Sequence, residues 1–467
     1  MNDPNGLVRI DNVYHLFFQY YPNDIVWGPM HWGHATSKDL VHWQQQPIAL
    51  YPDSLGYIFS GSAVVDSSNT AGFGGPGKTP MVAIFTHHDP IGEKAHQNTF
   101  QNQSLAFSLD KGASWTKYAG NPVLKNPGIT DFRDPNVSWY PKGKKWIMTL
   151  ATKDRISFYS SSDLKDWTKE SEFGEDIGAH GGVWECPDLF SFTRKEADGK
   201  EHTYWVLLVS NNPGGPNGGS GTQYFIGDWD GHVFKPLDRS TRWVDYGPDD
   251  YAGVLWNNAG RRRIFLGWMS NWDYANQVPT STWRNAMTIP RSVFLLDVAG
   301  KPYLASLPAP EVLSLQRRKM TLRRISVDSS ADLSSSIKDD AGRYIVSIRG
   351  AADQSVAFLF YDAAGEKIVF GYNNVKQEYY IDRSAAGNTD FHPGFGGIYT
   401  APRISKEKDL DLQFVMDRSS LEVFADGGLT VMTAVYFSQK PLTRIKVNTT
   451  DRWTIKELNY ASMASIW

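Results

Sequence analysis

The sequence predicts an all-β protein, and its composition gives the two observations behind that prediction. Aromatic residues make up 13% of the 467 residues, and the chain also contains 41 Gly and 25 Pro. Aromatic residues favour strands, whereas glycine and proline end them, so this combination indicates many short strands joined by turns. The chain is also longer than one ordinary hydrophobic core supports, which predicts two domains.

Charge and cysteine content exclude several classes of protein. The 47 basic residues nearly balance the 50 acidic ones, for a net charge of -3. Nucleic acid is therefore not expected as a partner, because proteins that bind it present strongly basic surfaces. The single cysteine excludes an internal disulfide and a cysteine-based metal site. No apolar stretch approaches the roughly 20 residues that a membrane span requires, so we expect none.

The first residues, MNDPNG, are predicted to form a turn, because Asp-Pro and Asn-Gly are strong turn signals. The apolar segment that follows, 7–22, predicts two strands around a second turn at residues 11 and 12. A turn needs no carboxylate. Asp3 is thus either a solvated turn residue or a residue with chemistry to perform, and the rest of the chain has to decide between them.

Four segments share one pattern: a short apolar strand, a turn rich in Ser, Asp or Gly, and a strand with an aromatic residue. Their aromatic residues are Trp43, Trp115, Trp167 and Phe234. A spacing of roughly 50 to 70 residues fits the blades of a β-propeller, and unrelated hairpins in a β-sandwich are the alternative. In a propeller the innermost strands surround one central pit, so residues far apart in sequence can meet there.

The pattern changes near residue 309, where a Pro-containing linker begins. We expect a propeller domain over 1–308, a linker over 309–320 and a β-sandwich domain over 321–467. The last region alternates apolar and polar residues, which predicts strands within 343–350, 355–362, 367–373, 412–428 and 430–437.

Three acidic residues stand beside apolar strand sequence rather than in charge runs: Asp3, Asp134 and Glu185. Two of them directly precede proline, which biases their backbones toward extended conformations. Each taken alone is more often a turn or cap residue. Together, at one per expected blade, they resemble a set of catalytic carboxylates.

Several motifs carry a resemblance to a known family. MNDPNG, FSGSAV at 59–64, FRDP at 132–135, WECPDLF at 184–190 and DRSSLEVF at 417–424 are similar to the signatures of glycoside hydrolase family 32, the β-fructosidases. The segments 28–43 and 267–291 resemble the levanase and exo-inulinase branch most closely. The resemblance runs from end to end and implies a five-bladed propeller followed by a β-sandwich.

The resemblance also implies roles for individual residues. Asp3 matches the family's nucleophile, Glu185 its general acid/base and Asp134 its transition-state stabiliser. The fructose pocket is matched by Asn2, Gln19, Trp27, Phe59, Ser60 and Arg133, and also by Tyr251 and Trp283. Cys186, beside Glu185, is interpreted as a small buried neighbour because no base is present to activate it.

The implied activity is retaining, exo-acting removal of terminal β-D-fructofuranosyl residues from levan, inulin or sucrose-type ends, through a covalent fructosyl-Asp intermediate. Two alternatives remain open: a fructosyltransferase that uses the same intermediate, and a non-catalytic fructan-binding propeller. We expect no cofactor and no metal, because His31, His34, His87 and His88 lie in strand sequence without an acidic third ligand. The oligomeric state stays open.

The start of the chain departs from the family pattern. Relatives usually carry a Trp directly ahead of Met-Asn-Asp that walls the pocket, and here no residue precedes Met1. We expect a secreted, periplasmic or cell-surface protein whose targeting segment is absent from this chain, with a cytoplasmic address left open.

Overall fold

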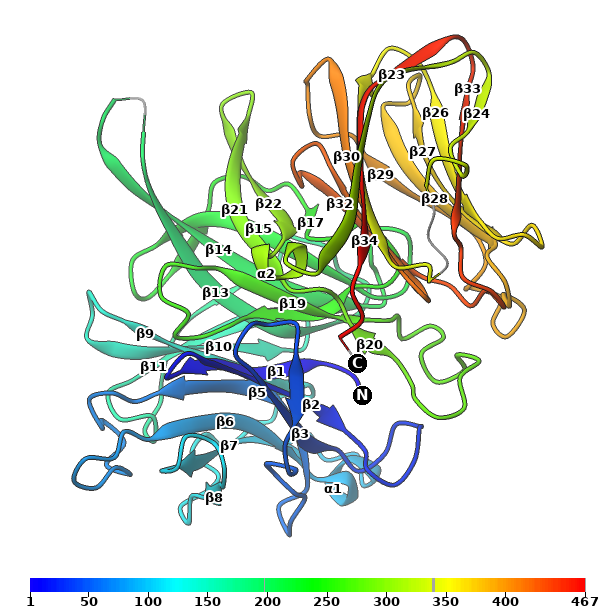
Figure 1. Ribbon diagram of the computed structural model, residues 1–467. Coiled ribbons are helices and arrows are strands. Elements are labelled where there is room, and N and C mark those ends of the chain that lie inside the picture. The colour runs from blue at the N-terminus through cyan, green and yellow to red at the C-terminus, as the bar shows by residue number, and fades with distance from the viewer. Residues whose placement is uncertain (197, 338–340, 467) are drawn as a thin grey trace.

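The computed structural model describes residues 1–196, 198–337 and 341–466, which are almost entirely strands and turns. The strands of these residues form seven sheets. Five small sheets form one body, and two six-stranded sheets form the other (Figure 1). The all-β prediction is therefore confirmed, as is the order of a propeller followed by a sandwich.

The five small sheets are the blades of the propeller, and neighbouring strands within each are antiparallel. The first contains β1 (Pro4–Ile10), β2 (Val13–Tyr20), β3 (His31–Ser37) and β4 (Trp43–Gln45). The second contains β5 (Tyr57–Val65), β6 (Met81–His88), β7 (Gln101–Ser108) and β8 (Thr116–Lys117), with helix α1 (Pro90–Lys94) between β6 and β7. The third contains β9 (Phe132–Tyr140), β10 (Lys145–Thr152), β11 (Arg155–Ser161) and β12 (Thr168–Phe173).

The last two blades each carry one additional short strand. The fourth contains β13 (Val183–Lys195), β14 (Glu201–Asn212), β15 (Gly221–Trp229) and β16 (Phe234–Pro236), with β17 (Arg242–Trp243) paired to β15. The fifth contains β18 (Tyr251–Leu255), β19 (Ile264–Met269), β21 (Arg291–Val298) and β22 (Lys301–Pro308), with β20 (Ala286–Met287) paired to β19.

The repeated sequence pattern corresponds to the two outer strands of the first four blades: β3–β4, β7–β8, β11–β12 and β15–β16. In three of them the serine that ends the third strand donates its hydroxyl to an aspartate two residues later. These pairs are Ser37–Asp39 (3.1 Å), Ser108–Asp110 (2.7 Å) and Ser161–Asp163 (3.0 Å). The pattern is therefore the signature of one outer turn, whose serine–aspartate contact recurs in the first three blades.

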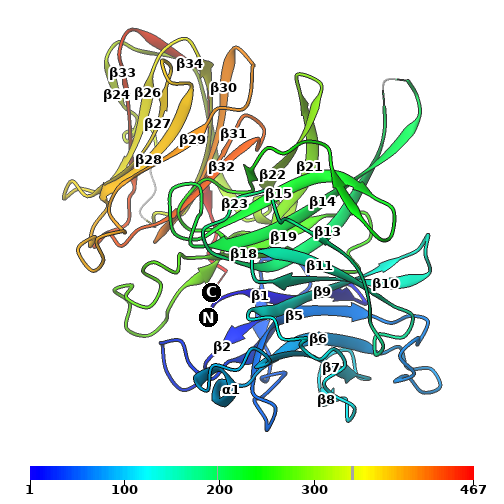
Figure 2. The ribbon, with the colours of Figure 1, turned by 180° about the vertical axis from the view of Figure 1, so that it is seen from behind.

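The ring closes between the first and fifth blades. The inner strands contact one another in the order β1, β5, β9, β13, β18 and back to β1, and Figure 2 shows them gathered at the centre. Asn257 follows β18, and its backbone bonds to Leu7 and Arg9 of β1 (2.9 and 3.0 Å). Its side-chain amide donates to the carbonyls of Ala63 (3.0 Å) and Val137 (3.3 Å), so one residue ties four blades together near the centre of the ring.

The sandwich contains two six-stranded sheets around one hydrophobic core. One sheet is formed by β23 (Gln316–Val327), β34 (Trp453–Met463), β25 (Tyr344–Ala351), β30 (Asp409–Asp417), β31 (Ser420–Ala425) and β32 (Thr430–Val435), in that order. The other is formed by β24 (Ser330–Asp332), β33 (Arg444–Thr449), β26 (Val356–Tyr361), β27 (Lys367–Asn373), β28 (Glu378–Ala385) and β29 (Ile398–Pro402). Helix α2 (Pro310–Leu313) lies between β22 and β23.

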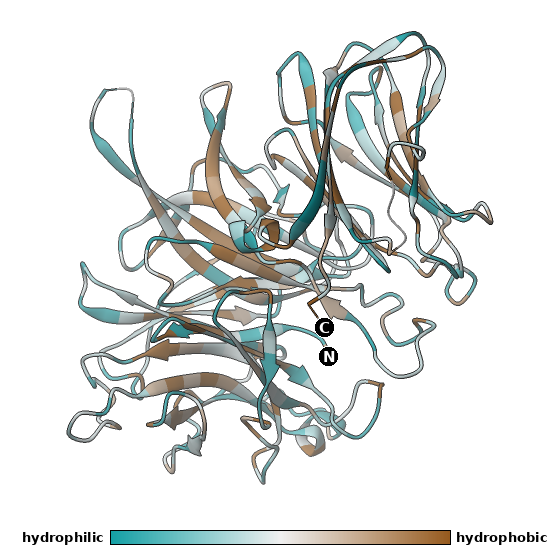
Figure 3. Ribbon diagram, viewed as in Figure 1, coloured by the Kyte–Doolittle hydropathy of each residue, from teal (hydrophilic) through white to brown (hydrophobic). Residues whose placement is uncertain are grey.

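Side-chain hydropathy follows this architecture. Phe358 and Phe414 face each other across the sandwich at 5.4 Å between ring centroids, with Trp453 beside them. Hydrophobic residues lie along the strands of both bodies, while many loops are hydrophilic (Figure 3). Each strand thus places an apolar face against its neighbouring sheet, and this burial stabilises both units.

The predicted N-terminal turn is wrong in one respect. The turn at residues 11 and 12 is present, with positive φ at both (47° and 63°), but Asn5 and Gly6 lie inside strand β1. The register between β1 and β2 shifts there, which is a β-bulge. Gly6 has φ 58°, and a Cβ at this position would lie 2.7 Å from the Phe17 ring, so only glycine fits.

Candidate active site

All five inner strands are irregular at the same end of the propeller. The register with the second strand shifts between Asn5 and Val8 on β1 and between Ile58 and Gly61 on β5. Similar shifts occur on β9, β13 and β18, where they bracket Asp134, Cys186 and Ala252. Bulges re-aim side chains, and here they surround one pit of about 220 Å³.

The pit brings together most of the predicted site residues. It is lined by the three carboxylates Asp3, Asp134 and Glu185, and by Asn2, Gln19, Trp27, Phe59, Ser60 and Arg133. Residues more than 180 positions apart in sequence meet there: the Sγ of Cys186 lies 3.7 Å from Asp3 Oδ2 and 3.6 Å from Asp134 Oδ2.

Asp3 stands directly before β1, and its carboxylate is held by two donors. The Ser60 hydroxyl donates to Oδ2 (2.8 Å) and the Asn2 amide donates to Oδ1 (3.1 Å). The Asp3 carbonyl accepts the backbone amide of Gln19 (3.1 Å), which fixes the main chain. Burial, and then the charge of Glu185, raise the pKa of Asp3 above its ordinary value, while the two donors act in the opposite direction.

Asp134 lies on β9 with φ 63°, a conformation that the bulge imposes. Its Oδ2 accepts the backbone amide of Cys186 at 3.0 Å. Burial raises the pKa of Asp134 to about 7, although the neighbouring Arg133 guanidinium lowers it. The charges of Glu185 and Asp3 also contribute to this raised pKa.

Glu185 has charged and polar partners rather than the apolar neighbours that its sequence context indicates. Arg133 donates to Oε1 through Nε (3.1 Å) and Nη2 (3.0 Å), and its Nη1 contacts Asp131. The Tyr251 hydroxyl donates to Oε2. Both oxygens of Glu185 are therefore held by donors from neighbouring blades, which fixes the orientation of the carboxyl group.

Cys186 is buried between the carboxylates. Burial, and then the charge of Asp134, raise the pKa of its thiol well above the ordinary value, so the sulfur is protonated and weakly nucleophilic. This agrees with its interpretation as a small buried neighbour.

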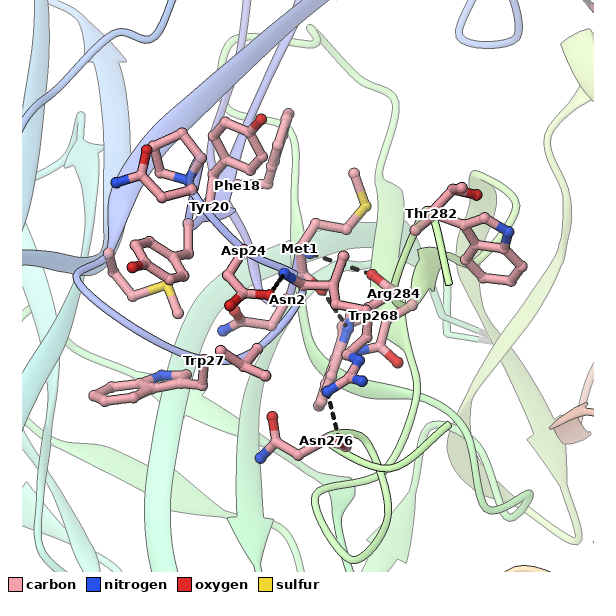
Figure 4. Close-up of a pocket in the computed structure, with 18 of the residues that line it drawn as sticks. Met1, Asn2, Phe18, Tyr20, Asp24, Trp27, Trp268, Asn276, Thr282 and Arg284 are labelled. Carbon is pink, nitrogen blue, oxygen red and sulfur yellow. Dashed lines mark hydrogen bonds between the residues drawn. The ribbon is translucent and has the colours of Figure 1, made fainter. Parts of the chain in front are cut away.

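A second cavity of about 490 Å³ adjoins the pit and shares Asn2, Trp27 and Trp272 with it. Figure 4 shows Trp27 and Asp24 on one side of this cavity, with Arg284 and Trp268 opposite. Trp283 lines this second cavity and not the pit, and it is 45% exposed, as Trp27 is (44%). Tyr251 lies behind Glu185 and is fully buried.

Two family models match the chain. The model of the glycosyl hydrolases family 32 N-terminal domain matches residues 1–306, and that of the glycosyl hydrolases family 32 C terminal matches residues 311–462. The chain belongs to glycosyl hydrolase family 32.

Relatives of this family 32 member agree with that assignment. A levanase of Bacillus subtilis is 43% identical over 100% of this chain and 69% of its own length. An extracellular exo-inulinase of Aspergillus niger is 39% identical over 94% of this chain and 87% of its own. The crystal structure of the exo-inulinase from Aspergillus awamori superposes with a TM-score of 0.91 at 35% identity, covering 100% of this chain and 96% of that one.

A second solved structure is bound to a sugar derivative. The beta-fructofuranosidase of Schwanniomyces occidentalis complexed with fructosyl-erythritol has a TM-score of 0.88 at 30% identity, covering 100% of this chain and 95% of that one.

Five further residues line the pit of this family 32 chain without having been predicted: His88, Glu93, Gln101, Asp131 and Trp272. The His88 ring stacks on Phe59 (4.1 Å between centroids), and its Nε2 lies 3.0 Å from Glu93. Asp131 was detectable as the acid two residues before Arg133 in the FRDP motif. The others had no local signal, because only folding brings β6, α1, β7 and the 270–285 loop to the pit.

Among the described residues, no group of three or more His, Cys, Asp or Glu side chains is arranged to hold a metal ion. Within the same ranges, no helix has the length and apolar character needed to cross a membrane.

Proposed function

We propose that this family 32 protein is a retaining, exo-acting β-fructosidase that removes terminal fructosyl units from levan, inulin or sucrose-type ends. The observation that carries the proposal is the meeting of Asp3, Asp134 and Glu185, from three different blades, in one small pit. The levanase and exo-inulinase relatives support fructan as the substrate class.

Asp3 is the nucleophile in this proposal. Its carboxylate attacks the anomeric carbon while Glu185 donates a proton to the departing oxygen, so the glycosidic bond breaks as the fructosyl-Asp3 ester forms. In the second half-reaction water attacks the anomeric carbon, Glu185 takes the proton from that water, and the ester bond breaks to free Asp3.

Asp134 holds sugar hydroxyls in the proposed complex. A hydrogen bond to a ring hydroxyl that strengthens in the transition state contributes several kcal/mol. The pKa of about 7 means that this group carries a proton in much of the free enzyme near neutral pH, so it can donate or accept such a bond. Arg133 and Tyr251 orient Glu185.

Exo action follows from the shape of the site. The pit of about 220 Å³ opens beside a wider cavity of about 490 Å³ lined by aromatic side chains. A terminal fructosyl unit fits the pit, and the rest of the fructan extends into the wider cavity. There the exposed side chains of Trp27 and Trp283 offer flat apolar faces to sugar rings.

The decisive experiment is product analysis on levan, inulin and sucrose with the wild type and with Asp3→Ala and Glu185→Ala. We expect free fructose from the first time point, and a loss of turnover on the order of a thousandfold in each variant. Glu175→Ala, at an acid whose side chain is 80% exposed, is the matched control and should change nothing. Early oligosaccharides, transfer products at high sucrose, or levan binding without release would each overturn the proposal.

Stereochemistry provides an independent test. A retaining enzyme has its two carboxyl groups about 5–5.5 Å apart, whereas an inverting one leaves room for a water between them. We expect that spacing between Asp3 and Glu185, and β-fructose as the first anomer in a rapid NMR time course. First-formed α-fructose would exclude the double displacement.

Two further points belong to the proposal. The extracellular exo-inulinases among the relatives support a secreted protein. We also propose that the two domains divide between Pro308, where β22 ends, and Gln316, where β23 begins, which is narrower than the expected 309–320 linker.

A further inference from the structure

The propeller segment 245–249 lies along β32, the edge strand of the sandwich. The backbone amides of Tyr246 and Asp249 donate to carbonyls of β32 (2.8 and 3.2 Å). In the other direction, the carboxylates of Asp245 and Asp249 accept the amides of Thr433 (2.8 Å) and Val435 (2.9 Å). Two aspartate side chains thus take the place of backbone carbonyls and satisfy an edge that would otherwise be unpaired.

The approach of the two backbones is as close as glycine allows. A Cβ on Gly247 would lie 2.2 Å from both the nitrogen and the oxygen of Thr433. Segment 245–249 is therefore held at a fixed distance from the sandwich, and it cannot move away without breaking buried hydrogen bonds.

Two buried arginines fix the end of this segment. Arg383 of β28 donates to Asp249 (2.6 Å), and Arg291 of β21 bridges Asp250 (2.9 Å) to Glu422 of β31 (2.7 Å). The side chains of these pairs are at most 2% exposed. Removing one partner of such a pair leaves an uncompensated buried charge, so these contacts fix the position of residues 249 and 250 strongly.

The next residue is Tyr251, which donates its hydroxyl to Glu185. Only one residue separates it from Asp249, and two peptide units span at most about 7 Å, so the chain has little slack. Ala252 follows with φ 54° and its amide on the Ser210 hydroxyl (3.1 Å), which fixes the other side of Tyr251. A displacement of Asp249 would therefore reach the phenol that orients Glu185.

We propose that Asp249 and Arg383 are positioning residues for proton transfer: the sandwich holds Asp249, and through it the Tyr251 hydroxyl on Glu185. This inference rests on the proposed role of Glu185 as the general acid/base. It gives the C-terminal domain a part in the reaction although none of the described residues of that domain lines the pit.

The test compares two substrates that differ in their need for a proton. Sucrose has a poor leaving group that requires a general acid, whereas 4-nitrophenyl β-D-fructofuranoside releases a stable phenolate and requires little help. In Asp249→Asn we expect kcat/KM on sucrose to fall about tenfold, and kcat/KM on the aryl fructoside to change less than about twofold. The ratio kcat/KM reports the first half-reaction and leaves out the second, in which Glu185 acts as base for both substrates. Tyr251→Phe should show the same selective loss.

The double variant decides whether the two residues act together. If Asp249 acts through Tyr251, adding Asp249→Asn to Tyr251→Phe should cost no further activity on sucrose, whereas independent effects multiply. Multiplying losses, or equal losses on both substrates, would overturn the inference.

A matched control exists within the sandwich. Asp426 is buried and accepts from Tyr379 (2.7 Å) and Arg403 (3.1 Å), just as Asp249 accepts from Tyr274 (2.5 Å) and Arg383. Asp426→Asn should lower the Tm comparably and leave the ratio of the two kcat/KM values unchanged. A changed ratio in this control would also overturn the inference.

Two arrangements keep the outcome interpretable. If Asp249→Asn does not fold, Tyr274→Phe removes one donor to Asp249, with Tyr379→Phe as its control, and the same double-variant criterion applies. Glu185→Gln distinguishes a failure of the proposed function from a failure of the positioning role. Wild-type activity on sucrose in Glu185→Gln would refute the proposed function. If the enzyme needs Glu185 but the losses of the double variant multiply, only the positioning role of Asp249 and Arg383 is refuted.

Discussion

Replacing Asp134 by asparagine should make the protein more stable at pH 8 and nearly inactive. Asp134 is buried beside two other carboxyl groups, and burial is the main reason that its pKa rises to about 7 from 3.8. An asparagine has nearly the same shape and can still accept the Cys186 amide through its oxygen, but it carries no charge to desolvate.

The size and sign of the stability change follow from the pKa. A rise of about 3 units, at about 1.4 kcal/mol per unit, sets a ceiling of about 4 kcal/mol for the destabilisation by the charged group. The folded state binds the proton more tightly, so this penalty is absent below pH 3.8, grows as the pH rises, and is complete above about pH 7. The Arg133 charge loses a partner in the variant, and we therefore expect a net gain of about 1–3 kcal/mol at pH 8.

Thermal unfolding of wild type and Asp134→Asn at pH 4 and pH 8 measures this difference. We expect the Tm advantage of the variant to be larger by a few degrees at pH 8 than at pH 4. Fructose release should fall at least about a hundredfold, because a neutral amide binds the sugar hydroxyl more weakly in the transition state than a carboxylate does. Asp154→Asn, at a 40% exposed acid, serves as control. A Tm difference between the variant and the wild type that does not depend on pH would refute this reasoning. So would a variant whose Tm falls furthest below that of the wild type at pH 8.

Two other predictions concern the fold. His15 and His34 bond to each other at 3.0 Å in the interior of the first blade, and burial lowers their pKa values to about 4 and about 3. The unfolded chain therefore takes up more protons than the folded one below pH 6.5, and the free energy of unfolding falls from there to about pH 3. His34→Gln should flatten the corresponding fall in Tm, while His96→Asn, at an exposed position, leaves it unchanged. Gly247→Ala should lower the Tm by more than about 5 °C, because the added Cβ would lie 2.2 Å from the Thr433 backbone. Gly75→Ala is the control and should have little effect, because there is open space around Gly75. Similar Tm values for the two variants would contradict the contact between the domains.

Local sequence predicted those features that depend on local chemistry. Positive φ at residues 11 and 12 forms the first hairpin, and period-two alternation marked strands such as β26 and β27. The motifs containing Asp3, Asp134 and Glu185 indicated which carboxylates meet in the pit. Such features can be predicted from the sequence because each depends on residues that are neighbours in the chain.

Contacts between distant elements could not be predicted in this way. Arg383 and Asp249 are 134 positions apart, and neither lies in a segment that a local pattern distinguishes. The contact of Arg133 with Glu185 likewise has no local signal, because the two residues meet only when β13 packs beside β9. The sequence context of Glu185 indicated apolar neighbours, because the residues adjacent in the chain are apolar, but a strand directs alternate side chains to opposite faces.

The proline-containing motifs of the third and fourth blades coincide with the β-bulges of their inner strands. Pro135 and Pro187 lie where the ladders of β9 and β13 are already interrupted, so the hydrogen bond that proline cannot donate is not required there. The same interruptions give Asp134 and Cys186 positive φ, and the Cys186 amide donates to the Asp134 carboxylate that lines the pit. The irregular backbone therefore shapes the pit, and it has to be stabilised by its surroundings, which next to β18 include the buried ion pairs that reach the sandwich.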